Sequence, residues 1–338
     1  MSLRKLCKSR FVRPLDKTFC RYYCQRKLTN AEIRKKRNAL FEEEKARQFS
    51  LVTRIEKIEV KYEGHPEPCT LIMNKGLSTP YHCTMHLQEL LMERSVVARV
   101  NGKLWDMHRP LEEDCTLELR HFLETSPFDS NDTFWRSMSF VLGHILETGF
   151  KENIRVNLCS FPRPNVKSGS FVYDADLGTA TTDYTINESV LRGLSAIGYR
   201  LSAQKLPFEP LFVDISLAER MFEDNLYKSK QLHAIASQSE SKSKVKVYRM
   251  GEHIDMSNGP LMSSTSQISS FKVTGIHPIT TDYGEMHRVQ GLAIPSGLML
   301  HYWAFEQLAE RAAKLNMDAV LPYIREGKEE VLTKELND

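Results

Sequence analysis

The sequence predicts an α+β protein in which a small, strand-rich module precedes a larger domain of mixed helices and strands. Residues 55–119 show strand-like alternation of apolar and polar side chains, interrupted by one helical pattern. Residues 126–131 form a turn-rich connector, after which helix-like and strand-like segments follow one another. With 338 residues, 41% hydrophobic and 26% charged, the chain is long enough for about two domains that each bury a core.

The first 30 residues are strongly basic. They contain nine Lys or Arg residues and a single acid, Asp16, so this segment carries a charge of +8 whereas the rest of the chain carries −5. Apolar residues are interleaved with the basic ones, as in presequences that direct import into mitochondria. We therefore predict a mitochondrial transit peptide over residues 1–27. The alternative is a basic arm that stays attached and binds nucleic acid.

A strongly charged helical pattern occupies residues 28–52. Its thin apolar stripe indicates a helix that docks on another element or lies on a surface. Four consecutive basic residues within it could neutralise RNA phosphates, namely Arg34, Lys35, Lys36 and Arg37. The alternative for such a charge run is a solvated helix face, and both interpretations stay open.

The strand-rich module spans residues 53–124. Strand patterns occupy residues 55–60, 69–73, 96–100 and 116–119. Between the second and third strands, residues 86–92 are predicted to form one helix. His82 and His86 have the spacing of metal ligands on a helix, but a capped helix start explains this run equally well, and we predict no metal site.

The larger domain is predicted over residues 130–318, and residues 319–338 form a charged tail. Its first helix places apolar side chains at helical spacing between residues 134 and 146. Further helices are predicted at residues 187–199 and 298–315, and strands at residues 154–158, 170–174, 245–249, 268–273 and 289–294. No apolar run approaches the roughly 18 residues needed to span a bilayer.

Two motifs in this domain resemble the editing domain of threonyl-tRNA synthetases. The segment starting at residue 135 reads Trp-Arg-Ser-Met-Ser-Phe, where that family has Trp-His-Ser-x-Ala-His. Residues 251–261 read Gly-Glu-His-Ile-Asp-Met-Ser-Asn-Gly-Pro-Leu, where the family has Gly-Asp-Phe-Val-Asp-Leu-Cys-x-Gly-Pro-His. Arg136 and Phe140 therefore stand at the two histidine positions of the first motif. Ser257 and Leu261 stand at the Cys and His positions of the second.

These four exchanges remove the chemistry that the resemblance would imply. Two His residues one helical turn apart, together with a Cys and a His, could hold a metal or orient a water for hydrolysis of wrongly charged tRNA. Arg136 stays protonated, Phe140 and Leu261 have no donor or acceptor, and Ser257 is a poor zinc ligand. We therefore predict a protein without catalytic residues, cofactors or a small-molecule substrate.

An enzymatic alternative would need a replacement set of groups to activate water. The nearest candidates are His144, His253, Asp255 and His287, and His144 lies one turn after Phe140. Each of these is explained more simply as a surface or satisfied residue. The alternative function is a free-standing deacylase of mischarged tRNA.

Further resemblances extend over residues 55 to 295 in the order seen in threonyl-tRNA synthetases. The strand-rich module has the order of elements of their β-grasp module, called TGS, which binds RNA or regulates. Residues 169–174 resemble the family's Gly-Phe-Tyr-Tyr-Asp strand, and residues 288–291 resemble its Arg-Ile-Tyr-Gly. The expected fold is thus a TGS-like β-grasp module followed by an editing-like α+β domain, and the chain stops where a synthetase would begin its aminoacylation core.

This truncated architecture, with a basic leader and a degenerate editing motif, resembles the threonyl-tRNA-synthetase-like family of large-subunit proteins of the mitochondrial ribosome, the number thirty-nine family. The resemblance implies a structural, non-catalytic role in mitochondrial translation, in the mitochondrial matrix. Its implied partners are the large-subunit ribosomal RNA and neighbouring ribosomal proteins. The charge of −5 outside the first 30 residues favours protein contacts over much of the surface. A tRNA-binding regulator outside the ribosome is the remaining alternative.

Overall fold

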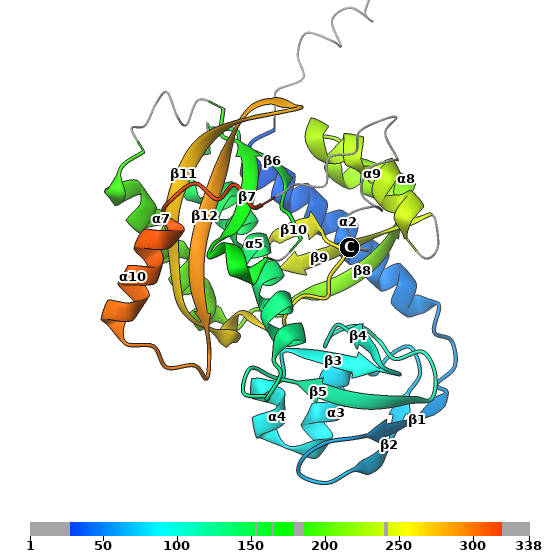
Figure 1. Ribbon diagram of the computed structural model, residues 1–338. Coiled ribbons are helices and arrows are strands. Elements are labelled where there is room, and N and C mark those ends of the chain that lie inside the picture. Colours follow the sequence, from blue (N-terminus) through cyan, green and yellow to red (C-terminus); the bar gives the residue numbers. More distant parts are fainter. Residues whose placement is uncertain (1–27, 153, 164, 179–185, 240–242, 320–338) are drawn as a thin grey trace, which may run out of the picture.

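The computed structural model describes residues 28–152, 154–163, 165–178, 186–239 and 243–319. The predicted transit peptide and, except for Ala319, the predicted charged tail lie outside the described residues. The described chain forms a small β-grasp unit, drawn in blue to teal in Figure 1, and a larger α+β domain, drawn in green to red apart from the blue helix α2 (Asn30–Ser50). The predicted α+β fold class is thereby confirmed. Among the described helices, none is long and apolar enough to cross a membrane.

The β-grasp unit is a mixed five-stranded sheet with two short helices on one face. Its strands are β1 (Lys57–Tyr62), β2 (Cys69–Asn74), β3 (Val97–Val100), β4 (Lys103–Trp105) and β5 (Cys115–Arg120), and its helices are α3 (Pro80–Leu87) and α4 (Glu89–Arg94). The sheet order is β2-β1-β5-β3-β4, and β1 runs parallel to β5 at its centre. The inward side chains of β1 alternate with exposed ones, as the sequence pattern predicts, because successive side chains of a strand point to opposite faces.

The helical part of this unit differs from the single helix predicted at residues 86–92. The first helix begins earlier, at Pro80, where the Thr79 side chain accepts a hydrogen bond from the His82 amide in a capping box. The chain then breaks at Gln88, which is extended (φ −163°, ψ 140°), before the second helix starts. This break allows Cys83 and Leu91 to pack together in the core beneath the sheet.

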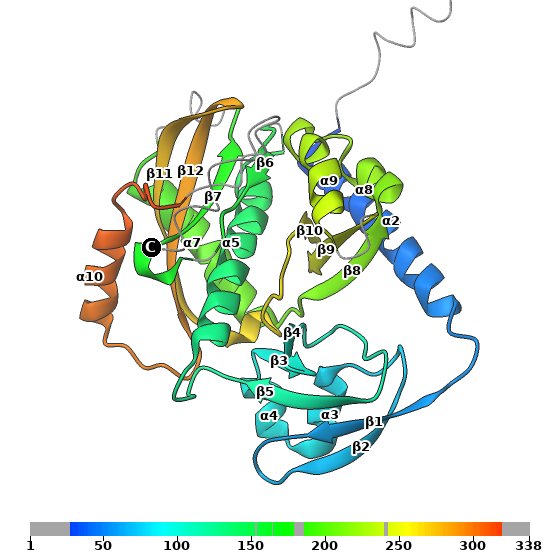
Figure 2. The ribbon, with the colours of Figure 1, turned by 45° about the vertical axis from the view of Figure 1, so that its right-hand side comes forward.

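The larger domain consists of two antiparallel sheets with helix α5 between them (Figure 2). One sheet has the order β11-β12-β7-β6 and the other β10-β9-β8. The strands are β6 (Asn157–Ser160), β7 (Phe171–Asp176), β8 (Glu209–Asp214), β9 (Lys244–Met250), β10 (His253–Met256), β11 (Ile268–Thr281) and β12 (Gly284–Pro295). The helices are α5 (Phe128–Gly149), α7 (Glu188–Gln204), α8 (Ile215–Phe222), α9 (Leu226–Gln238) and α10 (Tyr302–Ala312), with short 3₁₀ turns η1 (Val166–Ser168) and η2 (Thr265–Gln267).

Helix α2 (Asn30–Ser50) belongs spatially to the larger domain, although the β-grasp unit follows it in sequence. It lies beside β8, β10 and α8, as Figure 2 shows. Its Phe41 side chain is completely buried in a core that includes Val213, Val247 and Met256. The thin apolar stripe therefore docks the helix on the sheet, which is one of the two arrangements that its pattern predicts.

Candidate functional site

The four degenerate editing positions are brought together by α5 and by the chain that follows β10. Arg136 and Phe140 lie one turn apart on α5, and the Arg136 guanidinium donates a hydrogen bond to the Pro260 carbonyl (3.0 Å). Phe140 and Leu261 are members of the same core cluster. The two motifs thus meet in space as the resemblance implies.

Phe140 and Leu261 stand at two of the positions where the synthetase motifs have histidine, and both side chains are packed in the core. Both side chains are buried, with 0% and 1% of their surface exposed. The ring centroid of Phe140 lies 4.8 Å from that of His253, 5.8 Å from Phe208 and 6.3 Å from Tyr248. Aromatic contacts of this kind stabilise a core. Neither Phe140 nor Leu261 has a polar group of its own that could activate a water.

Ser257, the remaining exchanged residue, and its neighbours have local structural roles. Ser257 Oγ accepts a hydrogen bond from the Gly259 amide (3.2 Å) and so closes the turn after β10. Gly259 itself has a φ of +64°, and a Cβ there would collide with the Tyr248 hydroxyl, so the turn requires glycine. Directly after Arg136 on α5, Ser137 Oγ accepts a hydrogen bond from the Met262 amide (2.8 Å).

Asp106 is the residue that the sequence did not reveal. It comes from the β-grasp unit, is buried, and reaches into the larger domain. Its carboxylate accepts hydrogen bonds from Lys246 Nζ (2.5 Å), the Tyr248 hydroxyl (2.7 Å) and the Leu261 amide (3.0 Å). Asp106 therefore links the two units at the end of the second motif. The sequence offers one indication that Asp106 is unusual, which is that this charged residue stands between apolar Trp105 and Met107.

The candidate replacement group His253 belongs to a buried ionic cluster around Glu147, and the partly buried His144 lies beside it. Glu147 binds His253 Nδ1 (2.7 Å) and Arg37 Nη1 (2.8 Å). The rings of His144 and His253 lie 5.8 Å apart and nearly perpendicular. Burial, reinforced by the neighbouring His253, lowers the pKa of His144 to about 3, so it is a weak base.

Asp255 and His287, the other two candidates, are held in different places. Asp255 is buried and bonded to the Tyr173 hydroxyl (2.5 Å) and to Lys228 Nζ (2.6 Å). Burial, with the nearby Asp255 carboxylate, raises the pKa of Tyr173 well above its ordinary value. His287 lies on β12 and pairs with Ala175 of the neighbouring strand β7 in the same sheet. The four candidates therefore do not converge on an open site. In the described part of the chain, no group of three or more His, Cys, Asp or Glu residues could hold a metal.

The basic residues predicted to face RNA are mostly engaged within the protein. Arg34 Nη1 donates to the Glu147 carbonyl (2.7 Å), and Arg37 donates to the Glu147 carboxylate and to the Met221 carbonyl (3.1 Å). Lys36 forms ion pairs with Glu223 and Asp224. This corrects the premise of a solvated four-residue cluster, because Arg34 and Arg37 are buried and only Lys35 is exposed. An RNA contact at Lys35 stays a prediction.

Restoring the four family residues should not restore hydrolysis. We expect the variant with Arg136→His, Phe140→His, Ser257→Cys and Leu261→His to release no more amino acid from Ser-charged threonine tRNA than a boiled control. The physical reason is that positions 140 and 261 are enclosed in the core, so a substrate has no access to them. Sustained hydrolysis by the folded variant, measured as loss of acid-precipitable labelled serine, would contradict this.

Comparison with known proteins agrees with the architecture. A family model described as the TGS domain matches residues 72–120, which confirms the β-grasp unit. The chain is 31% identical over 229 residues, 65% of its length, to a probable cytoplasmic threonine–tRNA ligase 1 of Dictyostelium discoideum. It is 29% identical over 245 residues, 70% of its length, to cytoplasmic threonine–tRNA ligase 1 of Homo sapiens. The matched regions span only 29% and 30% of these two ligases.

A different relative matches over most of both chains. The chain is 45% identical over 282 residues to large ribosomal subunit protein mL39 of Drosophila melanogaster. This match covers 82% of the present chain and 84% of that protein, so the two share their architecture as a whole rather than one module. The chain therefore belongs to the family of large ribosomal subunit protein mL39.

Proposed function

We propose that this protein is a structural component of the large subunit of the mitochondrial ribosome and supports mitochondrial translation without catalysing a reaction. Membership of the mL39 family is the observation that carries the proposal. The burial of Phe140 and Leu261 supports its non-catalytic part, because the former editing positions are now part of the core. The scaffold of a synthetase would thus serve through its surface alone.

We propose a separate role for each predicted segment of the chain. Residues 1–27 would direct import into the mitochondrial matrix and residues 28–52 would brace the larger domain. The β-grasp unit (53–124) and the editing-like domain (130–318) would offer surfaces to ribosomal RNA and neighbouring ribosomal proteins. Support for the bracing role comes from Phe41, which α2 contributes to the core of the larger domain. Lys35, which is exposed on α2, is the proposed phosphate contact of this helix.

Sedimentation of mitochondrial extracts tests the proposal. A tagged full-length chain, expressed in cells depleted of the natural protein, is expected to co-migrate with the large ribosomal subunit at physiological salt. It should stay there after a wash with moderately raised salt, because apolar and hydrogen-bonded contacts are less sensitive to screening than isolated phosphate contacts. Recovery only at the top of the gradient, alone or with tRNA, would contradict a ribosomal role and favour the deacylase or the tRNA-binding regulator.

A further inference from the structure

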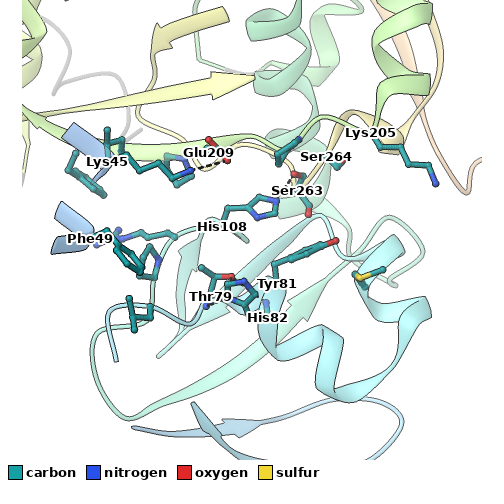
Figure 3. Close-up of a pocket in the computed structure, with 18 of the residues that line it drawn as sticks. Lys45, Phe49, Thr79, Tyr81, His82, His108, Lys205, Glu209, Ser263 and Ser264 are labelled. Carbon is teal, nitrogen blue, oxygen red and sulfur yellow. Dashed lines mark hydrogen bonds and ion pairs between the residues drawn. The ribbon is translucent and has the colours of Figure 1, made fainter. Parts of the chain in front are cut away.

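A cleft of about 1020 Å³ lies between the β-grasp unit and the larger domain (Figure 3). None of the four exchanged positions lines it. Lys45 and Phe49 of α2 lie at one end, Lys205 lies at the other, and His108 lies between them. The cleft slightly exceeds the range of about 300–1000 Å³ that is usual for small-molecule sites. It therefore has room for several residues of an extended chain.

The charges on the cleft wall balance. Three basic and three acidic residues line it, namely Lys45, Arg109, Lys205, Glu93, Glu112 and Glu209. Lys45 pairs with Glu209 (3.3 Å) and Arg109 with Glu112 (3.7 Å). Burial lowers the pKa of His108, so its imidazole is neutral at physiological pH. A surface without net charge does not favour the phosphate backbone of RNA, which proteins bind by neutralising its charge.

The wall also carries buried hydrogen-bonding groups that are not used within the described chain. Ser263 and Gln267 are both 2% exposed. Ser263 Oγ and Gln267 Oε1 have no hydrogen-bond partner among the described residues, although Gln267 Nε2 donates to the Ser95 carbonyl (2.6 Å). A buried polar atom that lacks a hydrogen-bond partner destabilises the fold, and a partner that supplies the missing hydrogen bond removes this cost. A hydroxyl that can donate and an amide oxygen that accepts together match the C=O and N–H of a peptide backbone.

Aromatic side chains also line the cleft, and one of them, His108, lies within hydrogen-bonding distance of the Ser263 carbonyl (2.9 Å). The rings of Tyr81 and His108 lie 4.8 Å apart at 41°, and Phe212 of β8 also lines the cleft. Although β8 is an edge strand, its edge is poorly suited to adding a strand. Pro210 has no N–H, and the Phe212 carbonyl already accepts from Gln48 Nε2 (2.7 Å). Recognition in the cleft would therefore depend on side chains rather than on extension of the sheet.

We propose that this cleft receives an extended polypeptide segment without net charge from a neighbouring protein of the large subunit. The segment places an apolar side chain against Tyr81 and His108 and satisfies Ser263 and Gln267 with its backbone. That the segment comes from a large-subunit protein rests on the proposed ribosomal function. That it is extended and uncharged is inferred from the residues that line the cleft.

Photo-crosslinking in the assembled particle tests this. Tyr81 is replaced by p-benzoylphenylalanine in the full-length chain, and large subunits are isolated on a gradient and irradiated. The expected adduct joins the chain to one other protein, resists nuclease and is absent when the purified chain is irradiated alone. The same photoreactive residue at Tyr199, which is exposed on α7 and does not line the cleft, should not capture that protein. A nuclease-sensitive adduct, or none at all from subunits that contain the chain, would overturn the proposal.

A blocking variant gives an independent result. Ser264→Trp fills the middle of the cleft and is expected to abolish the Tyr81 adduct, whereas Ser237→Trp, at an exposed position on α9, should leave its yield unchanged. Unchanged capture with Ser264→Trp would count against the cleft as the binding site. Failure of the unmodified chain to co-migrate with the large subunit would instead refute the proposed function, so the two failures are distinguishable.

Discussion

Glu147→Ala is expected to lower the free energy of unfolding by about 3–5 kcal/mol, because removing one partner of a buried ionic cluster leaves the others uncompensated. Arg37 and His253, both buried, would lose the carboxylate that they share. Equilibrium unfolding in urea, followed by circular dichroism, measures the loss. Glu188→Ala is the matched control, because Glu188 forms an exposed pair with Arg192 on α7 and should contribute less than about 0.5 kcal/mol. Equal decreases in unfolding free energy for Glu147→Ala and Glu188→Ala would contradict a stabilising role of the buried cluster.

The same cluster makes stability depend on pH. Burial opposes ionisation of Glu147, but His253 and Arg37 outweigh it and hold the pKa of Glu147 well below its ordinary value of 4.5. The stability that this contributes is fully present above pH 4.5 and is lost as the pH falls further. His144, with its pKa lowered from 6.5 to about 3, acts in the same direction from pH 6.5 downwards, because the unfolded state binds the proton more readily. The unfolding free energy of Glu147→Ala should therefore fall less steeply below pH 4.5 than that of the parent.

Phe140→Ala should have an effect of similar size, about 3–5 kcal/mol, because truncating a fully buried Phe removes its apolar contacts and leaves a cavity. The ring lies against Phe208, Tyr248 and His253 with none of its surface exposed. Urea unfolding again provides the measurement. Phe128→Ala on the same helix is the control, since Phe128 is 75% exposed and its loss should change stability little. A loss below about 1 kcal/mol at Phe140 would contradict the close packing of its ring in the core.

Much of the local structure follows from side-chain periodicity. The alternation along β1 predicted a strand because one face of the sheet is buried and the other is not. The helical spacing after residue 133 predicted α5, which is buried against both sheets. The break at Gln88 was not predictable in this way. It depends on how Cys83 and Leu91 fit the core of the β-grasp unit, and local pattern carries no information on that fit.

For the candidate site, too, some features follow from the sequence and others only from the tertiary structure. The resemblance to the synthetase motifs predicts Arg136, Phe140, Ser257 and Leu261 as exchanged positions. That these residues lack a base, a thiol or a metal ligand then follows from residue type alone. What these residues now do required the tertiary structure. The burial of Arg34 and Arg37 on Glu147 joins residues more than 100 positions apart, and Asp106 reaches Leu261 from another unit. Such contacts depend on the chain path through space, which decides whether a charged side chain meets water, RNA or a buried partner of opposite charge.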